Sequence, residues 1–541
     1  MNDTLTILLP KLIILGFIMA FGASVGSLVN VLVYRLPLGL DVVSPTSRCP
    51  KCNTKLTWRE NIPIFGWLIL RGKCRFCKAS ISPEYPIVES VVAGLFGLLY
   101  ALWYLVEPGS SLLGIPFGDL APEWARNGPA MTWPALVVLL ILLGSLVAMT
   151  IIDARTYTIP LVLTWVPAMV ALLFHTGHAI WFTTTKGTLE PVVAGYWNFS
   201  DSFGRWVTAP NAIWTIPTPG FGSWRFIGIT LGATLGLFIA NMMLKHKLLT
   251  RSFADYDQWF QEHSSSDPNT TEKADNQSHD SELQSESQSI LESKLALTPI
   301  PQSESMEFPQ TDSSELQPDS DPDSIPNPGP DLQTSEPQSS NESPEPAGAE
   351  PDTHAPTQEW IMYPYARREM IRELAFLAPV AACAMFGGWL AVLLVTHFAG
   401  AWTINPINGT MIAPMQAPLW LVVFSGVLAG YLIGGGVVWA VRILGSLLFN
   451  KEAMGLGDVH MMAAVGACMG WIDSTFAFFI AAFVALFIAA MTGLLGKGKF
   501  LKPIPYGPSL AIATLLVLFL KPIVEWGLGL ILKMEGPFNL P

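Results

Sequence analysis

Charged residues are scarce in this chain of 541 residues. They make up 13% of the sequence, whereas hydrophobic residues make up 51%. Soluble globular proteins carry about 25% charged residues. The shortage disfavours a cytosolic enzyme and favours a protein that crosses a membrane several times. The sequence also lacks a stripe of basic residues interleaved with aromatic ones, so we expect no nucleic-acid binding.

The N-terminus lacks a basic residue before Lys11, and its apolar run continues to about Val33. A cleavable signal peptide has a basic start and an apolar region of only about 7–15 residues. The run therefore predicts a first membrane helix that stays in the protein.

Apolar stretches of about the length that spans a bilayer recur along the chain and predict an all-α integral membrane protein. We expect a polytopic helical bundle of about ten spans. Two of the stretches, 459–471 and 508–520, are short, and the motifs that border them support their assignment. The other predicted spans are 7–33, 87–105, 134–152, 159–175, 225–244, 373–397, 417–441 and 474–495.

The distribution of Lys and Arg predicts the orientation, because short loops rich in these residues stay in the cytoplasm. Nine basic residues lie between the first two spans, from Arg35 to Lys78, so this loop is expected inside. Counting spans onward, the loop 398–416, which has no Lys or Arg, falls outside. Arg442 and Lys451 are counted as charges of an inside loop.

Basic residues are also nearly absent between Asp255 and Glu359, which contain 24 acidic and two basic residues, a net charge of −22. The remaining residues carry 28 basic and 18 acidic side chains, a net charge of +10. The segment is rich in Ser, Pro and Gln and cannot bury enough apolar surface to fold. We expect a disordered acidic tether, either without a specific task or with a docking role.

Four of the six cysteines stand in the basic loop as two pairs with CxxC spacing, Cys49 with Cys52 and Cys74 with Cys77. Two such pairs can bind one Zn²⁺ tetrahedrally, and the reducing cytosol disfavours disulfides. We expect one structural zinc ion per chain; a redox dithiol and unbound cysteines are the alternatives. Cys383 and Cys468 lie in apolar spans and are expected to be small core residues.

Two aspartates stand at the ends of predicted spans, where ionisable residues are costly and often functional. Asp153 closes the third span, and Asp458 opens the short span near 459–471. The orientation places both at the cytoplasmic face, where two carboxyl groups that meet would share a proton. One could then activate a water while the other polarises an amide carbonyl, as in aspartic proteases. The alternatives are that Asp458 only caps its helix and that Asp153 only pairs with Arg155.

Further motifs accompany these residues in a fixed order. They are residues 26–31 with 34–37, 47–50, 61–64, 84–86 with Glu89, Asp153 with 159–160 and 163–164, 451–458, and 505–508. Together they resemble the type IV prepilin peptidases, bacterial membrane aspartic proteases with a GxGD motif, here Gly-Leu-Gly-Asp at 455–458. The resemblance covers roughly residues 20–175 and 417–520.

The resemblance implies a bacterial enzyme of the cytoplasmic (inner) membrane. It would cleave the leader peptide of type IV prepilins, or of the pseudopilins of type II secretion, at the cytoplasmic face, with Asp153 and Asp458 as catalytic residues. Members that carry the four cysteines also methylate the new N-terminus with S-adenosylmethionine, and we expect this activity here. No glycine-rich nucleotide loop is visible, so the sequence does not place the methyl donor.

The chain departs from the family pattern at two places. The family commonly has Lys two residues after the GxGD aspartate, where this chain has His460. This histidine either faces the interface as a polar residue or tunes the aspartates or contacts substrate. The family also has eight spans, whereas this chain is expected to have two more in an insert. Two additional spans leave the direction of the later spans unchanged, so both aspartates remain on the cytoplasmic side.

The expected organisation is as follows: a first span (1–34), a cytoplasmic zinc-binding domain (35–86), spans with the first catalytic aspartate (87–175), an insert with an extracytoplasmic loop and an extra span (176–254), the tether (255–360), a second extra span (361–416) and C-terminal peptidase spans (417–541). Two other functions compete with the peptidase. One is a methyltransferase or scaffold with an inactive protease site. The other is a proton-coupled transporter, which the absence of a repeated pair of broken spans disfavours.

Overall fold

Without water, backbone polar groups must bond within their own segment, so the apolar runs fold into helices. The computed structural model describes residues 2–43, 47–49, 51–107, 109–111, 117–121, 125, 129–186, 221–253, 255, 365–404, 411–415, 417–449, 453–494, 505–524 and 527. The chain divides into a unit of Met1–Ala254 with Met362–Pro541 and a second unit, Asp255–Ile361. The expected disordered tether therefore lies outside the described residues, apart from Asp255.

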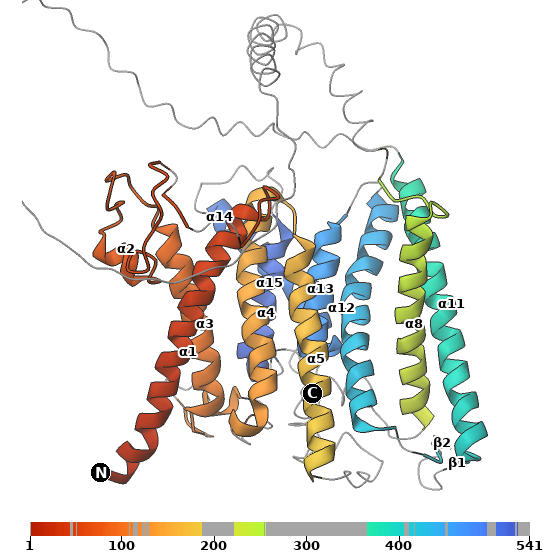
Figure 1. The fold of residues 1–541 in the computed structure, drawn as a ribbon. Coiled ribbons are helices and arrows are strands. Elements are labelled where there is room, and N and C mark those ends of the chain that lie inside the picture. Colours follow the sequence, from red (N-terminus) through yellow and green to blue (C-terminus); the bar gives the residue numbers. More distant parts are fainter. Residues whose placement is uncertain are drawn as a thin grey trace, which may run out of the picture. The chain divides into compact units, whose positions relative to one another are not determined.

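The described part of the first unit is almost wholly helical (Figure 1). One short antiparallel pair, β1 (Thr403–Ile404) with β2 (Met411–Ile412), is its only sheet in the described residues. The helices are α1 (Asn2–Arg35), α2 (Phe65–Ile69), α3 (Glu84–Tyr104), the 3₁₀ turn η1 (Phe117–Asp119), α4 (Pro129–Thr156), α5 (Leu161–Lys186), α8 (Phe221–Lys245), α11 (Ala366–Ala399), α12 (Leu419–Phe449), α13 (Leu456–Met469), α14 (Trp471–Leu494) and α15 (Tyr506–Phe519).

Among the described residues, 8 helices are long and apolar enough to cross a membrane, and α13 and α15 are shorter apolar helices. The predicted multi-pass, all-α architecture is confirmed. Several helices run further than the predicted spans. Thus α5 continues to Lys186, past the expected boundary at 175, and α12 continues to Phe449, past the predicted end at 441.

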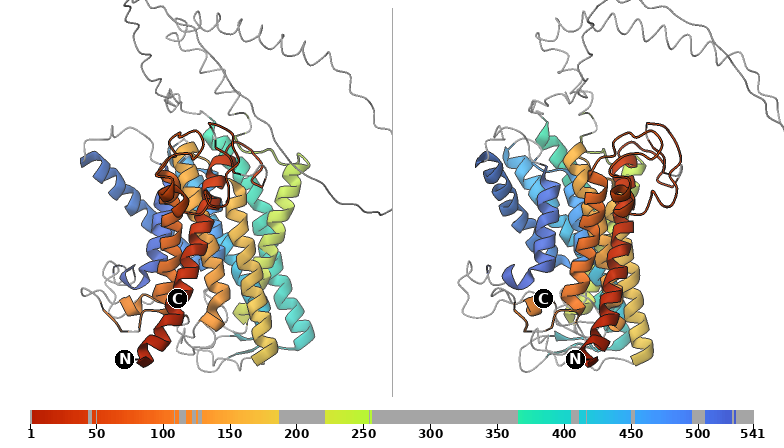
Figure 2. Two further views of the ribbon diagram at one scale, coloured as in Figure 1. Left: turned by 60° about the vertical axis from the view of Figure 1, so that its left-hand side comes forward. Right: turned by 90° about the vertical axis from the view of Figure 1, so that its left-hand side faces the viewer.

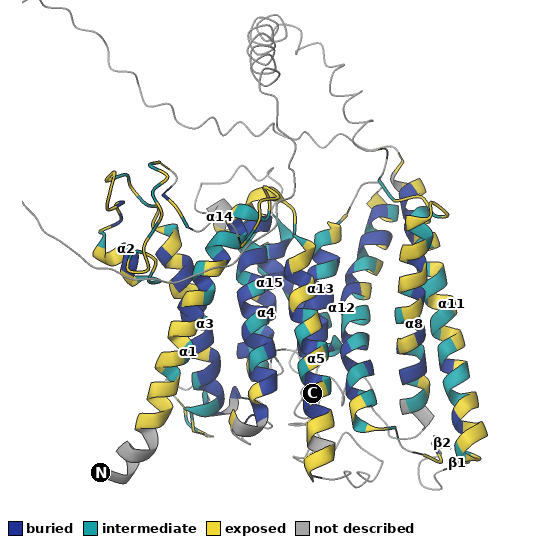
Figure 3. Cartoon of the chain, viewed as in Figure 1, coloured by how far each residue is buried: buried dark blue, intermediate teal, exposed yellow. Residues whose placement is uncertain are grey.

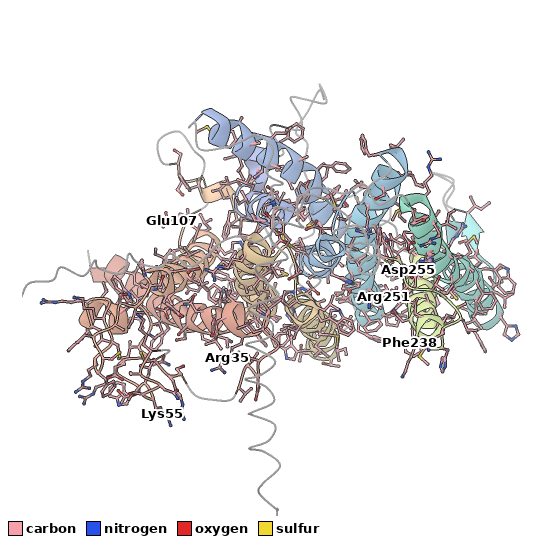
Figure 4. The ribbon with its side chains drawn as sticks, turned by 90° about the horizontal axis from the view of Figure 1, so that it is seen from above. Arg35, Lys55, Glu107, Phe238, Arg251 and Asp255 are labelled. Carbon is pink, nitrogen blue, oxygen red and sulfur yellow. The ribbon has the colours of Figure 1, made fainter. Side chains whose placement is uncertain are left out.

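The spans alternate in direction through the bundle (Figures 1 and 2). Helix α4 runs toward the end of the bundle where α13 and α15 begin, the upper end in Figure 1. The cysteine-bearing segment between α1 and α3 lies at this same end. We call this end of the bundle, where α4 ends and α13 and α15 begin, the site end. Seen along the helices, the loop that carries Lys55 and the helices α8 and α11 lie on opposite sides of the bundle (Figure 4).

Helix α13 lies at the centre of the bundle and packs on α4, α5, α12, α14 and α15. All its residues from 458 to 469 are buried except His460. Helices α1, α11 and α14 instead contain many exposed apolar residues, among them Phe17, Phe386 and Phe483. Exposed residues along α1 and α11 are yellow in Figure 3. That pattern fits a bundle whose outer faces contact lipid rather than water.

Helices α8 and α11 form a close antiparallel pair that is built on glycine. Gly228, Gly232 and Gly236 recur every four residues on α8 and face the backbone of α11. A Cβ on Gly232 would lie within 2.1 Å of the Cys383 carbonyl oxygen, a contact that only glycine avoids. Small residues at this spacing let membrane helices approach closely. Helices α8 and α11 thus pack as one antiparallel unit; they are the spans that the sequence predicted as additional to the family pattern.

Gly232→Ala should loosen this pair, because the added methyl group has no room against α11. We expect the free energy of unfolding to fall by about 1–3 kcal/mol, as for other overpacked sites. Gly94→Ala on α3 is the matched control, because nothing lies within 4 Å of its added Cβ. Denaturant unfolding in detergent micelles measures both; equal stabilities for the two variants would contradict the packing described here.

Candidate active site and cysteine cluster

Asp153 stands in the last turn of α4 and is buried, with 7% of its surface exposed. Its Oδ2 accepts a hydrogen bond from the backbone N–H of Gly507, at the start of α15, over 3.1 Å. A Cβ on Gly507 would lie 2.4 Å from the same oxygen. Glycine is therefore needed at 507 for α15 to approach the carboxylate.

Asp458 is the third residue of α13 and is buried, with 8% exposed. The N-cap position belongs to Gly455, whose backbone is extended. The Asp458 carboxylate accepts a backbone hydrogen bond from Gly455. The alternative that Asp458 is the N-cap residue is therefore wrong, although its carboxylate does bond a free N–H of the helix start.

The structure brings Asp153 and Asp458 together. Helices α4 and α13 are in contact, and the two carboxyl groups interact electrostatically. Arg155 pairs with Glu84 on α3. The alternative that Asp153 pairs with Arg155 thus finds no support in the described contacts. Two buried carboxyl groups at one end of a membrane bundle form the candidate active site.

The two glycines of the 455–458 motif have different surroundings. A Cβ on Gly457 would meet Ile159 at 3.1 Å, so this glycine allows α13 to pack on the segment after α4. A Cβ on Gly455 would meet no atom nearer than the Asp458 Oδ2 at 3.7 Å. Space beside the carboxylate is therefore found at Gly455.

The four cysteines between α1 and α3 form two matching turns. In each turn the first Cys accepts a backbone hydrogen bond from the residue after the second Cys, Asn53→Cys49 and Lys78→Cys74. Asn53 and Lys78 also share a positive φ, 54° and 58°. Short bridges, Arg48 with Lys55 and Lys73 with Ser80, close both turns. The CxxC spacing thus folds twice into the same knuckle.

The sulfurs of these knuckles converge. All four lie within 4.8 Å of one another, and Cys49 Sγ lies 3.8 Å from Cys77 Sγ. Zinc–sulfur bonds of about 2.3 Å in a tetrahedron put neighbouring sulfurs about 3.8 Å apart. Cys49, Cys52, Cys74 and Cys77 therefore fit a tetrahedral metal ion, and the cluster can hold one.

The thiols of the cluster differ in acidity. Hydrogen bonds from the Thr54 side chain and backbone lower the pKa of Cys52 to about 6. A backbone hydrogen bond from Ala79 lowers the pKa of Cys77, but desolvation and the neighbouring thiols outweigh it and raise that pKa to about 11. Crowded thiols cannot all ionise without a cation among them, and thiolates are the metal-binding form.

Known proteins share these features. The family model described as the Bacterial Peptidase A24 N-terminal domain matches residues 20–103. The prepilin leader peptidase/N-methyltransferase of Klebsiella pneumoniae is 32% identical over 230 residues, which cover 41% of this chain and 85% of that protein. The protein of the same name from Pseudomonas aeruginosa is 30% identical over 257 residues, covering 41% and 79%. That of Myxococcus xanthus is 41% identical over 111 residues, covering 19% and 33%.

This chain belongs to the prepilin leader peptidase/N-methyltransferase family. The resemblance inferred from the motifs is confirmed. No solved structure matches the chain. Because the match to the Klebsiella pneumoniae relative covers 41% of this chain, more than half of the present sequence lies outside it. The family features therefore occupy only part of this larger chain.

Within the family motifs, Glu89 on α3 has a structural task that its position in the sequence did not reveal. Its carboxylate accepts a hydrogen bond from the Ile64 N–H over 2.6 Å and another from Ser27 on α1. Ile64 has a positive φ of 62°, which is unusual for a β-branched residue. Glu89 thus ties the segment before α2, in the cysteine-bearing region, to α1 and α3.

Three further residues singled out in the sequence, Cys383, Cys468 and His460, lie on α11 and α13. Cys468 is buried on α13 and its Sγ lies 3.5 Å from the Pro167 carbonyl oxygen, so it is a core residue as predicted. Cys383 on α11 is only half-buried and is not part of the buried core. His460 is half-buried on α13, two residues after Asp458, and its two alternative roles stay open.

Two charged residues near the site were misjudged or missed. Arg442, predicted to be an inside loop charge, is buried within α12, with 2% exposed. It forms an ion pair with Glu373 on α11, which was not singled out. An Arg and a Glu at the ends of apolar runs are the signal that could have found the pair, because such residues seldom stand there without a partner.

Proposed function

We propose that this protein cleaves the leader peptide of type IV prepilins or of type II secretion pseudopilins, with Asp153 and Asp458 as its catalytic pair. One observation carries the proposal. In a member of this peptidase family, two buried aspartates from α4 and α13 interact at one end of the bundle. The named activity of the relatives and the chemistry of paired carboxyl groups point to the same reaction.

The reaction follows from the pair. Two buried carboxyl groups that interact directly share one proton between them. The ionised one takes a proton from a water, which attacks the carbonyl carbon of the scissile peptide bond. The protonated one donates a hydrogen bond to the carbonyl oxygen. The C–N bond then breaks, and the leaving amine takes up a proton. The Gly507 N–H fixes the orientation of Asp153, and we propose that the peptide lies beside Gly455, where an added Cβ would make no close contact.

We propose that the site end faces the cytoplasm of a bacterium and that the bundle spans its inner membrane. Basic residues of the cysteine-bearing segment, such as Lys51, Lys55 and Arg59, support this orientation. The hydrophobic segment that follows a prepilin leader would lie in the bilayer beside the bundle. Its leader would reach the aspartates at the membrane surface.

We further propose that the cysteine cluster binds one structural Zn²⁺. Four thiolates would close its coordination shell and leave no position for substrate. The ion would supply folding energy to a segment with few buried apolar residues, of which Cys49 and Cys74 are themselves two. This metal therefore takes no part in the cleavage step.

Methylation of the new N-terminus is part of the proposal because the relatives are named as N-methyltransferases. S-adenosylmethionine would supply the methyl group. In the described residues the only strands are β1 and β2, so no glycine-rich loop between a strand and a helix is present to bind a nucleotide. No residue is assigned to the methyl donor, and no step is derived through it.

Asp153→Asn and Asp458→Asn should each abolish leader cleavage of a co-expressed prepilin, because neither variant retains a proton-sharing carboxyl pair. Asp473→Asn on α14 is the matched control: Asp473 is also a buried aspartate in a span, but it pairs with Lys521. Cleavage is measured by the shift of the pilin band. Wild-type rates in either site variant would refute the assignment. Such rates would favour the alternative functions, a methyltransferase or scaffold with an inactive protease site or a transporter.

Gly507→Ala should lower the cleavage rate strongly, by about 100-fold, because its methyl group displaces the Asp153 carboxylate and misplacements of about 1 Å have effects of that size. Gly436→Ala on α12 is the control, since nothing lies within 4 Å of its added Cβ. Initial rates of leader cleavage in detergent compare the two. An active Gly507→Ala enzyme would contradict the close approach of α15 to Asp153.

Purified protein should contain about one zinc ion per chain, because one tetrahedral shell takes all four thiolates. Changing Cys49, Cys52, Cys74 and Cys77 together to Ser should remove it, whereas Cys383→Ser should retain it. Elemental analysis of protein purified without added metal measures the content. A folded wild-type protein that contains no zinc would refute the assignment of the four cysteines as zinc ligands.

A further inference from the structure

Helices α11 and α12 are joined by a buried ion pair near the candidate active site. Arg442 Nη2 lies 3.1 Å from Glu373 Oε1, and both side chains are 3% exposed. Arg442 Nε also donates to Glu373, and the Trp439 indole N–H donates to Glu373 Oε2 over 2.7 Å. The carboxylate is thus held by several donors of α12 and fixes the guanidinium in one orientation.

Arg442 extends this link to the segment that carries Asp458. Its Nη1 donates to the Met454 carbonyl oxygen, immediately before Gly455. A second bond to α12, from the Ala453 N–H to Ser446 Oγ over 3.1 Å, holds the same segment. Arg442 also interacts electrostatically with Asp458 itself. The start of α13 is therefore tied to α12 on the side of the active site.

The segment after α8 packs against Arg442. The Arg442 Cζ lies over the Phe253 ring, 5.4 Å from the centroid of that ring. The Phe253 N–H donates to Glu369 Oε2 over 2.7 Å, and Glu369, one turn before Glu373 on α11, is wholly buried. Helix α11 and the segment that follows α8 thus both contribute to the surroundings of one arginine.

A buried ion pair is seldom a source of net stability, because desolvation offsets the attraction between the charges. Such pairs are best attested where they fix one specific arrangement. Here the arrangement that Glu373 and Arg442 fix includes the backbone just before Gly455, whose N–H in turn bonds Asp458. Two non-polar residues would dock α11 on α12 equally well but would leave the Met454 carbonyl without this donor.

We propose that the insert is a brace for the active site: Glu373 of α11 orients Arg442, and Arg442 holds the Met454 carbonyl so that Asp458 is positioned toward Asp153. Glu373 and Arg442 are positioning residues in this account, and neither touches substrate. The inference rests on the proposed peptidase function. It assigns a task to the two spans that this chain has in addition to the eight expected from the family resemblance.

Arg442→Lys keeps the charge but cannot reach both Glu373 and Met454 with a planar fork. We expect its kcat for cleavage of a purified prepilin to fall about 10- to 100-fold, with KM unchanged, since catalytic geometry is lost while the binding surface remains. Glu373→Gln should have a smaller effect in the same direction. Rates are measured well below each variant's unfolding midpoint, so that lost stability alone does not lower kcat.

Lys521→Met is the control, because it breaks a different ion pair between apolar helical segments, Lys521 with Asp473, which is not part of the brace. It should lower the unfolding midpoint and leave kcat at the wild-type value. A kcat for Arg442→Lys equal to that of the wild type would overturn the proposal.

Whether Glu373 acts on the site through Arg442 is tested in the Arg442→Met variant. If Glu373 acts through Arg442, adding Glu373→Gln to this variant should lower kcat no further. A full additional loss would show that Glu373 acts on the site by another route, and the brace would be wrong as drawn.

Hydrogen exchange of the peptide that covers residues 453–460 tests the brace without any activity. Arg442→Lys should speed exchange there and leave exchange at α4 unchanged. Equal exchange in wild type and variant would refute the brace. An inactive wild type with the expected exchange pattern would refute the peptidase proposal instead.

Discussion

Two carboxyl groups buried at one end of an apolar helix bundle are the constraint on which the rest of this structure depends. Each is costly to bury, so each needs a specific partner. Asp153 has the Gly507 N–H, and Asp458 has the Gly455 N–H. These contacts bring the ends of three helices, α4, α13 and α15, close together. They also require glycine at position 507, where the backbone of α15 approaches the Asp153 carboxylate.

In our proposal α8 and α11 form an insert that enlarges the bundle without disturbing the site. Its two helices, α8 and α11, form a close antiparallel pair, so they return the chain to the side from which it left. The spans that follow keep their direction, and α13 still begins where α4 ends (Figure 1). The pair then attaches to α12 through Glu373 and Arg442. In our proposal this attachment lets the addition serve the site instead of merely lying beside it.

Much of the fold followed from the sequence, because apolar runs of sufficient length leave a chain few choices in a bilayer. Counting spans also indicated that Asp153 and Asp458 share one end, and the CxxC spacing indicated the converging knuckles. The ends of helices were less predictable, since α5 and α12 continue past the ends of the predicted spans. Arg442 was misplaced for that reason. Its partnership with Glu373 depends on tertiary packing between α11 and α12, which no local pattern encodes.

The central claim is that Asp153 and Asp458 act as one unit. It is tested most directly by comparing the residual leader-cleavage rates of Asp153→Asn, Asp458→Asn and the double variant. Groups that act as a unit are strongly non-additive, because either loss removes the whole function. We predict that the double variant cleaves at the same residual rate as each single variant. Independent losses that multiply in the double variant would contradict the account.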